Sequence, residues 1–324
     1  MNKQFTAVIL LVLWGLSTGV LAEPTATQFA RSVVSIESTI EPTGRTVALL
    51  GSERSGSGAV VDSTGLIVTA GYLVLEATEV LVTFGNDKPV AAEIVVNDHA
   101  TGLALLRSEL PPEIVPLSLG DSGLIGIEDD VVVLPHGGTD AAHVTRVADI
   151  REFAGSWEYL IDRAIYTAPA TRAFSGAALI NRDAQLIGIG SLLLSNIYTE
   201  GAHAESRVNG NLFIPVEHLQ RSMGRFLNGQ PSVNARPWLG TILNEAVPDL
   251  EIVRVAEESP AAVAGLQQRD KIISINNIRV TTMSDFYQQL WDQQVGDSVD
   301  LLIVRQDRVI PVTVTTADRS IWLR

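Results

Sequence analysis

The stretch that decides the fold is Ser55-Gly56-Ser57-Gly58-Ala59-Val60-Val61-Asp62, followed by the turn residues Ser63-Thr64-Gly65 and a second apolar run at Leu66–Thr69. Short apolar or alternating runs separated by turn residues are typical of β-strands. The same pattern recurs between about residues 33 and 215. The further runs are Glu79–Phe84, Val90–Val96, Leu103–Arg107, Val131–Leu134 and Leu186–Ile189. We therefore expect a closed all-β barrel or a sandwich, and neither a helical nor a parallel α/β fold.

The rest of the chain is organised differently, and a length of 324 residues suggests about two domains. A helix is predicted from about Val216 to Leu227, and the polar segment after it, Asn228–Asn234, is typical of a linker. Beyond it, Ser259-Pro260 offers a helix cap with proline in the first turn, and Ser284–Gln294 has a helical apolar pattern. A smaller domain of strands and two helices is expected there.

The N-terminus predicts export from the cytoplasm. Lys3 precedes an apolar run from about Ala7 to Leu21, and small residues lead up to Glu23. This is the pattern of a secretory signal peptide, with cleavage after Ala22. A retained membrane anchor is less favoured, because the run is shorter than the roughly 18 to 20 residues of a spanning helix. We expect a periplasmic protein.

Composition limits the possible partners and cofactors. The net charge of −14 argues against nucleic acid or anionic lipid as the main partner, and the absence of cysteine excludes disulfides and thiolate chemistry. Histidines, with Asp98 or Asp140 beside them, leave metal binding as a minor alternative, although no compact ligand spacing supports it. The five histidines are His99, His136, His143, His203 and His218. We expect no cofactor and no metal.

Several short segments, in order and at matching distances, resemble the HtrA/DegP family of secreted serine proteases. Ser55–Asp62, with Gly65 and Thr69, is similar to the family's entry into its catalytic histidine loop. The later matches are Leu103–Leu106, Leu119–Ser122, Ser175-Gly176 and Leu179–Asn181. The resemblance implies a mainly β chain: a trypsin-like double β-barrel over residues 23–228 after a signal peptide at 1–22, a linker at 229–236, one α+β PDZ domain at 237–318 and a tail at 319–324.

The resemblance also locates the catalytic positions, and two of the three have changed. Tyr72 stands where the family has its histidine, Gly102 where it has its aspartate, and only Ser175 remains. A serine hydroxyl becomes a useful nucleophile when a neighbouring base takes its proton, and that base needs a partner that orients it. Tyrosine, with a reference pKa near 10, is about 0.1% ionised at neutral pH. This pattern predicts a degenerate triad.

The loop before Ser175 departs from the family as well. Ala173 and Phe174 replace a Gly-Asn pair, and Ala173 would take up the glycine's backbone conformation only at a cost. We expect an altered oxyanion loop. The region Leu192–Gly210, which in the family lines the specificity pocket, is predicted to be a long polar surface loop, a candidate to close over the cleft or to contact a partner.

The C-terminal part resembles a PDZ domain of the HtrA type. Its matches are Pro237–Thr241, Glu258–Gln267 and Asp270–Asn276, with departures at Arg269 and Asn277 where glycine is common. In such domains, loop N–H groups bind a peptide's terminal carboxylate while the peptide adds as a strand beside a helix. The peptide-binding residues implied are Trp238, Leu239, Gly240, Thr241, Phe286 and Leu290. Of these, Leu239, Gly240 and Thr241 match the carboxylate-binding loop, and Phe286 with Leu290 would line the apolar pocket. The alternative is a groove that is occupied internally.

These observations lead to a functional hypothesis of an exported, non-catalytic HtrA-like pseudoprotease. It would act as an adaptor, scaffold, chaperone-like protein or regulator, with protein C-termini, extended segments or an active HtrA-type relative as partners. A homo-oligomer, a trimer, is implied by the resemblance alone. The alternative is an active serine endopeptidase in which Ser175 works with a displaced base.

Overall fold

The structure, a computed structural model, describes residues 26–198, 207–226, 236–246 and 249–323. The predicted signal peptide, nearly all of the predicted linker and His203 lie outside these residues. The chain divides into two compact units. The N-terminal unit comprises the chain up to Asn97, Leu103–Ile150 and Ala164–Gln220, and the C-terminal unit comprises Asp98–Gly102, Arg151–Arg163 and Arg221–Arg324. The domain boundaries given above remain predictions.

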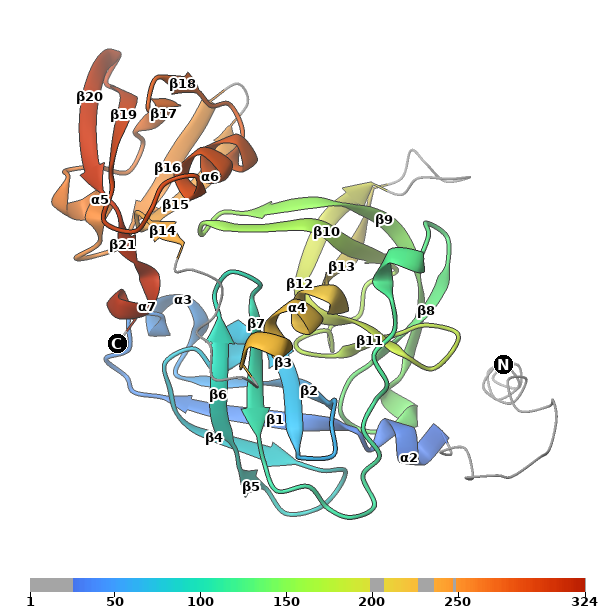
Figure 1. Cartoon of the computed structure of the whole chain (residues 1–324). Coiled ribbons are helices and arrows are strands. Elements are labelled where there is room, and N and C mark those ends of the chain that lie inside the picture. The colour runs from blue at the N-terminus through green and yellow to red at the C-terminus, as the bar shows by residue number, and fades with distance from the viewer. Residues whose placement is uncertain (1–25, 199–206, 227–235, 247–248, 324) are drawn as a thin grey trace. The chain divides into compact units, whose positions relative to one another are not determined.

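The first half of the N-terminal unit is a seven-stranded sheet with the strand order β5-β4-β1-β2-β3-β7-β6 (Figure 1). Its elements are α2 (Ala26–Ala30), β1 (Val33–Ile40), α3 (Val47–Leu50), β2 (Glu53–Val60), β3 (Leu66–Ala70), η2 (Gly71–Leu73, a 3-10 helix), β4 (Ala77–Thr83), β5 (Val90–Ala91), β6 (Glu93–Asp98) and β7 (Leu103–Arg107). Val34, Ile36, Ile67 and Leu106 are among the fully buried side chains that form its core.

Residues 55–69 form most of β2, a turn and most of β3. Asp62 Oδ1 accepts hydrogen bonds from the Thr64 N–H at 2.9 Å and the Leu66 N–H at 3.0 Å, which closes the turn. Within β2, an added Cβ on Gly58 would lie 2.6 Å from Ile36 Cδ1 and 2.7 Å from Ile67 Cγ2. Glycine at this position therefore lets the neighbouring strands' side chains pack across the sheet.

The second half of the unit is a closed barrel with the strand order β10-β13-β12-β11-β8-β9. Its elements are η3 (Ser122–Leu124), β8 (Asp130–Leu134), η4 (Thr139–Ala141), β9 (His143–Gly155), β10 (Tyr159–Ala168), β11 (Ala178–Ile180), β12 (Leu186–Tyr198), β13 (Arg207–Pro215) and α4 (Val216–Phe226). Three of them, β9, β10 and α4, extend into the C-terminal unit. Val133, Leu179, Ile187 and Phe213 are fully buried in its core. The prediction of a mainly β, trypsin-like domain is confirmed.

The prediction of a long loop from Leu192 to Gly210 is wrong in its described part. Strand β12 continues to Tyr198 and β13 begins at Arg207, with Leu192 opposite Leu212 and Ile197 opposite Val208. Ile197 is buried, so an apolar side chain in a polar stretch keeps the hairpin extended. Residues 199–206 lie outside the described part.

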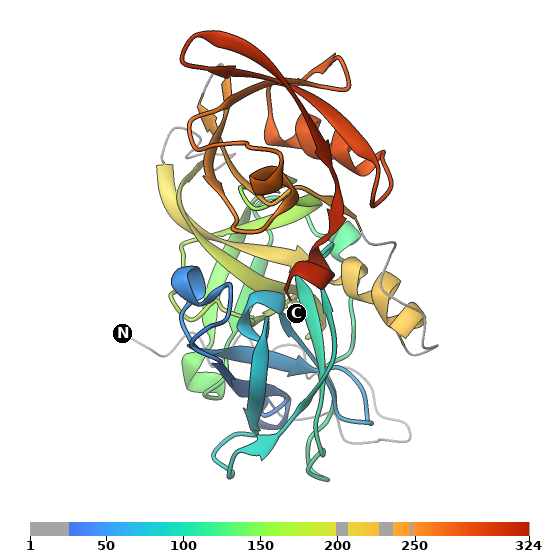
Figure 2. The ribbon, with the colours of Figure 1, turned by 90° about the vertical axis from the view of Figure 1, so that its left-hand side faces the viewer.

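The C-terminal unit contains a sheet in the order β15-β16-β17-β19-β20, with β18 beside β17 and helix α6 against its face (Figures 1 and 2). Its elements are β14 (Pro237–Trp238), β15 (Thr241–Ala246), β16 (Asp249–Val255), α5 (Pro260–Val263), β17 (Lys271–Ile275), β18 (Ile278–Arg279), α6 (Met283–Trp291), β19 (Ser298–Arg305), β20 (Arg308–Thr315), β21 (Ala317–Asp318) and α7 (Arg319–Trp322). The predicted α+β domain with two helices is present, with the additional short helix α7.

Local capping explains where the two predicted helices begin. Ser259 accepts a hydrogen bond from the Ala262 N–H at the start of α5, and Thr282 with Asp285 forms a capping box at the start of α6. Arg269 and Asn277, the two departures from glycine, adopt left-handed conformations with φ of 74° and 64°. These positions therefore keep the backbone geometry that glycine would provide more easily.

Candidate functional site

Tyr72 and Ser175 meet in the N-terminal unit. Tyr72 lies in η2, directly after β3, and Ser175 lies in the turn before β11. The two hydroxyl oxygens, Tyr72 Oη and Ser175 Oγ, are 2.6 Å apart, within hydrogen-bonding distance. Both residues are half-buried, so the pair is neither sealed in the core nor fully hydrated. The residue at the histidine position thus contacts the serine directly.

The backbone that carries Tyr72 is held from two sides. Arg54 donates hydrogen bonds to the Tyr72 carbonyl at 2.8 Å and the Leu75 carbonyl at 2.9 Å. The Asn97 side-chain amide donates to the Gly71 carbonyl at 2.9 Å. These bonds satisfy the carbonyl groups of the 3-10 turn, and they hold the backbone at Tyr72 in place. Sequence reasoning missed Arg54 and Asn97, since neither belongs to a catalytic motif.

The turn carrying Ser175 is packed closely against β2 and β12. The Ser57 N–H donates to the Ser175 carbonyl at 2.8 Å, and the Gly176 N–H donates to the Gly190 carbonyl at 2.8 Å. Gly176 has φ of 67°, and an added Cβ on it would lie 1.9 Å from the Ser57 carbonyl oxygen. Glycine after the serine is therefore a geometric requirement of this turn.

In the predicted oxyanion loop, the N–H group of Ala173 already has a hydrogen-bond acceptor within the loop. The Ala173 N–H donates to Thr171 Oγ1 at 3.2 Å, and Ala173 does not adopt a positive φ. Asn211, fully buried on β13, accepts from the Thr171 N–H at 2.8 Å and donates to the Thr171 carbonyl at 3.0 Å. The altered oxyanion loop at Ala173 and Phe174 stays a prediction.

Gly102, at the position of the family's aspartate, belongs to the C-terminal unit. Its φ is 75°, and an added Cβ would lie 2.3 Å from Tyr159 Oη. That hydroxyl donates a hydrogen bond to the Thr101 carbonyl at 2.6 Å. Burial raises the pKa of Tyr159 far above its usual range, so it is a neutral donor. The space that an aspartate side chain would need is filled by this phenol.

The histidines lie in separate places. His136 Nδ1 is 3.0 Å from Ser57 Oγ, and His143 Nε2 is 3.4 Å from the Pro169 carbonyl. Burial, together with the nearby charge of Arg319, lowers the pKa of His99 to about 4. In the described part of the chain no histidine is hydrogen-bonded to Ser175, and the same residues hold no group of three acidic, histidine or cysteine side chains able to bind a metal.

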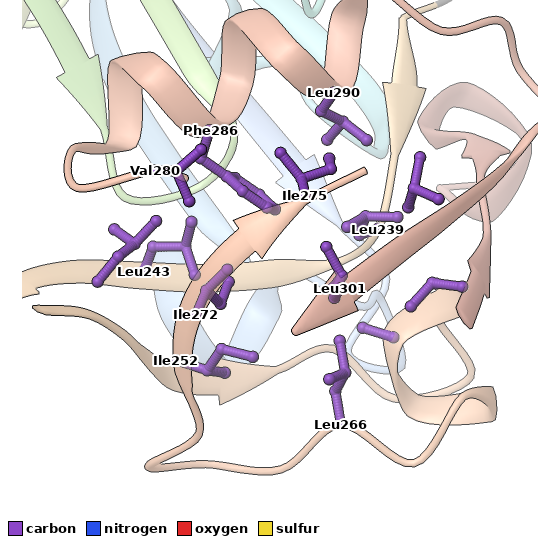
Figure 3. Close-up of a cluster of buried hydrophobic side chains, with 14 of the residues drawn as sticks. Leu239, Leu243, Ile252, Leu266, Ile272, Ile275, Val280, Phe286, Leu290 and Leu301 are labelled. Carbon is purple, nitrogen blue, oxygen red and sulfur yellow. The ribbon is translucent and has the colours of Figure 1, made fainter. Parts of the chain in front are cut away.

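The predicted peptide-binding residues come together in the C-terminal unit. Leu239, Phe286 and Leu290 are fully buried in one apolar cluster (Figure 3). The Trp238 ring packs on the Trp322 ring, with centroids 4.9 Å apart. Gly240 has φ of 87°, and an added Cβ would lie 2.3 Å from the Ser259 Cβ. A larger residue at Gly240 would therefore distort the loop itself.

Glu158 is a residue of this site that sequence reasoning missed. Its carboxylate accepts hydrogen bonds from the N–H groups of Leu239 at 3.0 Å, Gly240 at 2.9 Å and Thr241 at 2.9 Å. These are the three residues that the resemblance assigned to carboxylate binding. Glu158 lies 82 positions before Gly240 in the sequence. No local pattern in the sequence could have paired them.

Two protein-family models match the chain. The trypsin-like peptidase domain matches residues 56–189, and the PDZ domain matches residues 251–305. The periplasmic serine endoprotease DegP of Salmonella typhimurium is 24% identical over 280 residues, covering 82% of this chain and 57% of DegP. Serine endoprotease DegS of the same species is 22% identical, covering 81% and 76%. Serine protease HTRA1A of Danio rerio is 29% identical, covering 71% and 51%.

Solved structures agree on the fold. HtrA-type protease AlgW with a decapeptide superposes with a TM-score of 0.53 at 19% identity, covering 90% of this chain and 98% of AlgW. AlgW with a tripeptide gives 0.52 at 20% identity, covering 91% and 97%. The chain spans little more than half the length of the DegP relatives it matches. A trypsin-like peptidase domain followed by a PDZ domain defines the class, and in this arrangement the chain is HtrA/DegP-like.

The prediction that the chain is not an enzyme is contradicted by these comparisons. The relatives are named serine endoproteases, and the family points to active proteases. The inference from Tyr72 and Gly102 was too strong for a physical reason. The sequence shows only that the histidine and the aspartate are absent. It does not reveal that Ser175 has a hydrogen-bonding partner in Tyr72.

Proposed function

We propose that the protein is an exported serine endopeptidase in which Ser175 is the nucleophile and Tyr72 its proton acceptor. The contact between Tyr72 Oη and Ser175 Oγ, at 2.6 Å, carries the proposal. The names of the relatives support it, because they are serine endoproteases. The displaced base is thus a tyrosine at the histidine position, and none of the described histidines is needed.

The proposed reaction uses the ionised form of Tyr72. The phenolate takes the proton of Ser175, and Oγ attacks the peptide carbonyl carbon to form a tetrahedral oxyanion. The neutral phenol then returns the proton to the departing amine, which leaves an ester on Ser175. Water hydrolyses the ester, with Tyr72 taking the water's proton and returning it to Ser175. Protons and charges balance over the cycle.

The pKa of Tyr72 sets the speed of this reaction. Burial raises the pKa above its usual value, and the hydrogen bond from Ser175 partly opposes that rise. Since an unperturbed tyrosine is about 0.1% ionised at pH 7, the phenolate is scarcer still in this site. Slow hydrolysis at neutral pH and faster hydrolysis in alkaline solution are expected.

Peptide recognition by the PDZ domain is the second part of the proposal. The predicted carboxylate loop presents three N–H groups in one direction, and the AlgW structures are described with a decapeptide and a tripeptide. The substrates or partners would be protein C-termini or extended segments of envelope proteins, which also allows an adaptor, scaffold or chaperone-like role beside catalysis. Amidated peptides should lose binding if the loop captures a carboxylate.

Location and assembly form the third part of the proposal. Several relatives are named periplasmic endoproteases, which supports export of this chain. Within the described residues, no helix has the length and apolar character needed to cross a membrane. A homo-oligomer, or a mixed assembly with a relative, rests on the resemblance and is tested by light scattering of the purified protein.

A fluorophosphonate probe and a casein substrate test the catalytic proposal. The wild type should be labelled, with faster labelling at pH 9 than at pH 7, and casein should be cleaved. Ser175→Ala should abolish both signals, and Tyr72→Phe should reduce them to background. Ser63→Ala, in the exposed turn before β3, is the matched control and should behave as wild type. Labelling that persists unchanged in Ser175→Ala, or a folded wild type that is never labelled between pH 7 and 10, would overturn the proposal.

A further inference from the structure

The three N–H groups of the PDZ carboxylate loop already have a ligand within the C-terminal unit. Glu158 Oε1 accepts from Gly240 and Thr241, each at 2.9 Å, and Oε2 accepts from Leu239 at 3.0 Å. The Thr241 hydroxyl adds a fourth hydrogen bond at 3.1 Å. The Glu158 residue is only 5% exposed. A buried carboxylate with four donors is a fully formed binding contact.

The backbone before Glu158 is docked as well. The Leu243 N–H on β15 donates to the Ser156 carbonyl at 2.8 Å. On α6, the Tyr287 hydroxyl donates to the Gly155 carbonyl at 2.7 Å and accepts from the Glu158 N–H at 3.1 Å. The segment Gly155–Glu158 therefore bonds to a strand on one side and to a helix on the other. That is the arrangement in which a PDZ domain holds a peptide.

The charges and apolar contacts around the tip favour this docking. Ala154 and Leu160, on either side of it, pack against the apolar cluster of the unit. Arg319 donates to the Trp157 carbonyl at 3.3 Å. Burial raises the pKa of Glu158, whereas the N–H groups of Thr241 and Leu239 and the charge of Arg319 act in the opposite direction. Glu158 also holds a left-handed backbone with φ of 58°, an uncommon conformation for a non-glycine residue.

We propose that Gly155–Glu158 is a resident ligand of the PDZ groove, with the Glu158 side chain in the place of a terminal carboxylate. A free peptide C-terminus binds only when it displaces this segment. This inference rests on the proposed peptide recognition and makes it conditional. It also defines a second class of ligand for the groove, an internal acidic residue on a hairpin tip, beside a true chain end.

The apparent affinity for a free peptide is proportional to the fraction of molecules in which the groove is open. If the segment is docked in about 99% of molecules, a peptide binds about a hundredfold more weakly than to an open groove. Glu158→Gln keeps the shape of the side chain but replaces one acceptor by an N–H₂ donor that faces the N–H groups of the loop. This substitution should open the groove while leaving the rest of the hairpin unchanged.

The test measures a fluorescein-labelled decapeptide, with an apolar last residue and a free carboxylate, by anisotropy on the full chain carrying Ser175→Ala. Glu158→Gln should bind it roughly tenfold or more tightly than the parent. Glu152→Gln, at an exposed position of the same hairpin, is the control and should match the parent. The amidated form of the peptide should bind neither the parent nor Glu158→Gln. Equal affinities of the parent and Glu158→Gln would overturn the inference.

Hydrogen exchange without peptide separates this inference from the proposed function. The amides of Leu239, Gly240 and Thr241 should be protected in the parent and exchange faster in Glu158→Gln, with no change in Glu152→Gln. Protection that is the same in all three proteins overturns the resident ligand. Protection that is lost as expected, combined with no peptide binding in any variant, supports the resident ligand and rejects peptide recognition.

Discussion

Tyr159 fills the space beside Gly102. An added Cβ on Gly102 would lie 2.3 Å from Tyr159 Oη, and Gly102 itself has φ of 75°. Both the backbone conformation and the neighbouring phenol therefore select glycine. An acidic side chain at this position would therefore collide with Tyr159.

Gly102→Ala should destabilise the C-terminal unit by more than the cost of its backbone conformation. A left-handed conformation costs a non-glycine residue about 1 to 2 kcal/mol, and the clash with Tyr159 adds to it. Gly265→Ala is a matched control in the same unit, because Gly265 has φ of 79° and nothing within 4 Å of an added Cβ. Urea unfolding measures both, and equal losses in free energy of unfolding would contradict the clash.

The rate of Ser175 labelling should rise with pH in a way set by Tyr72. Since burial raises the pKa of Tyr72 above its usual value near 10, the phenolate fraction grows about tenfold per pH unit between pH 7 and 9. Fluorophosphonate labelling, stopped at fixed times and at constant ionic strength, gives the labelling rate at each pH. A rate that levels off near pH 7 would instead point to a histidine as the base. Tyr72→Phe should lack the rise.

Acidification should weaken the C-terminal unit through His99. Its pKa of about 4 in the folded protein lies below the unfolded value of 6.5, because burial disfavours the charged ring and Arg319 repels it, while Asp98 and Asp318 oppose these effects. Between these two values the unfolded chain binds more protons, so the stability present above pH 6.5 is lost as pH falls toward 4. Thermal unfolding of wild type and His99→Gln across this range tests it. The variant should show the smaller fall in Tm.

Arg305→Met should be strongly destabilising, unlike the loss of an exposed ion pair. Arg305 donates to both carboxylate oxygens of Asp270 at 2.6 Å, and the Asp270 side chain is fully buried. Leaving that carboxylate without its cation should cost about 3 to 5 kcal/mol. Arg146→Met, which breaks an exposed 3.0 Å pair with Asp130, should cost less than about 1 kcal/mol. Similar losses in chemical denaturation would contradict the distinction.

Local patterns account for the parts of the structure that the sequence predicted well. The turn at Asp62 and the cap at Ser259 are closed by hydrogen bonds within four residues, so their residue types alone report them. The long strand β12 was partly missed because polar residues interrupt its apolar pattern, although Ile197 packs inside. Residue type predicted the elements wherever the stabilising contact is close in sequence.

The chemistry of the site was predicted less well, because it depends on contacts between distant residues. Tyr72 and Ser175 were each named, but they are 103 positions apart and only the folded chain brings their hydroxyls together. Glu158 was not named, since nothing in its neighbours distinguishes it from a solvent-facing acid on a hairpin. The positions of candidate groups could be predicted, and their partners could not.

The discontinuity of the C-terminal unit has a consequence for protein synthesis. Arg151–Arg163 leaves the ribosome well before Leu239–Thr241 exists, and folding during synthesis proceeds largely from the N-terminus. The hairpin tip is therefore synthesised before the loop that binds it. When the carboxylate loop forms, a ligand on the same chain is already present. A fragment that starts at Arg236 carries the loop without that ligand. Affinities measured on such a fragment would describe an open state that the intact polypeptide enters only after displacement.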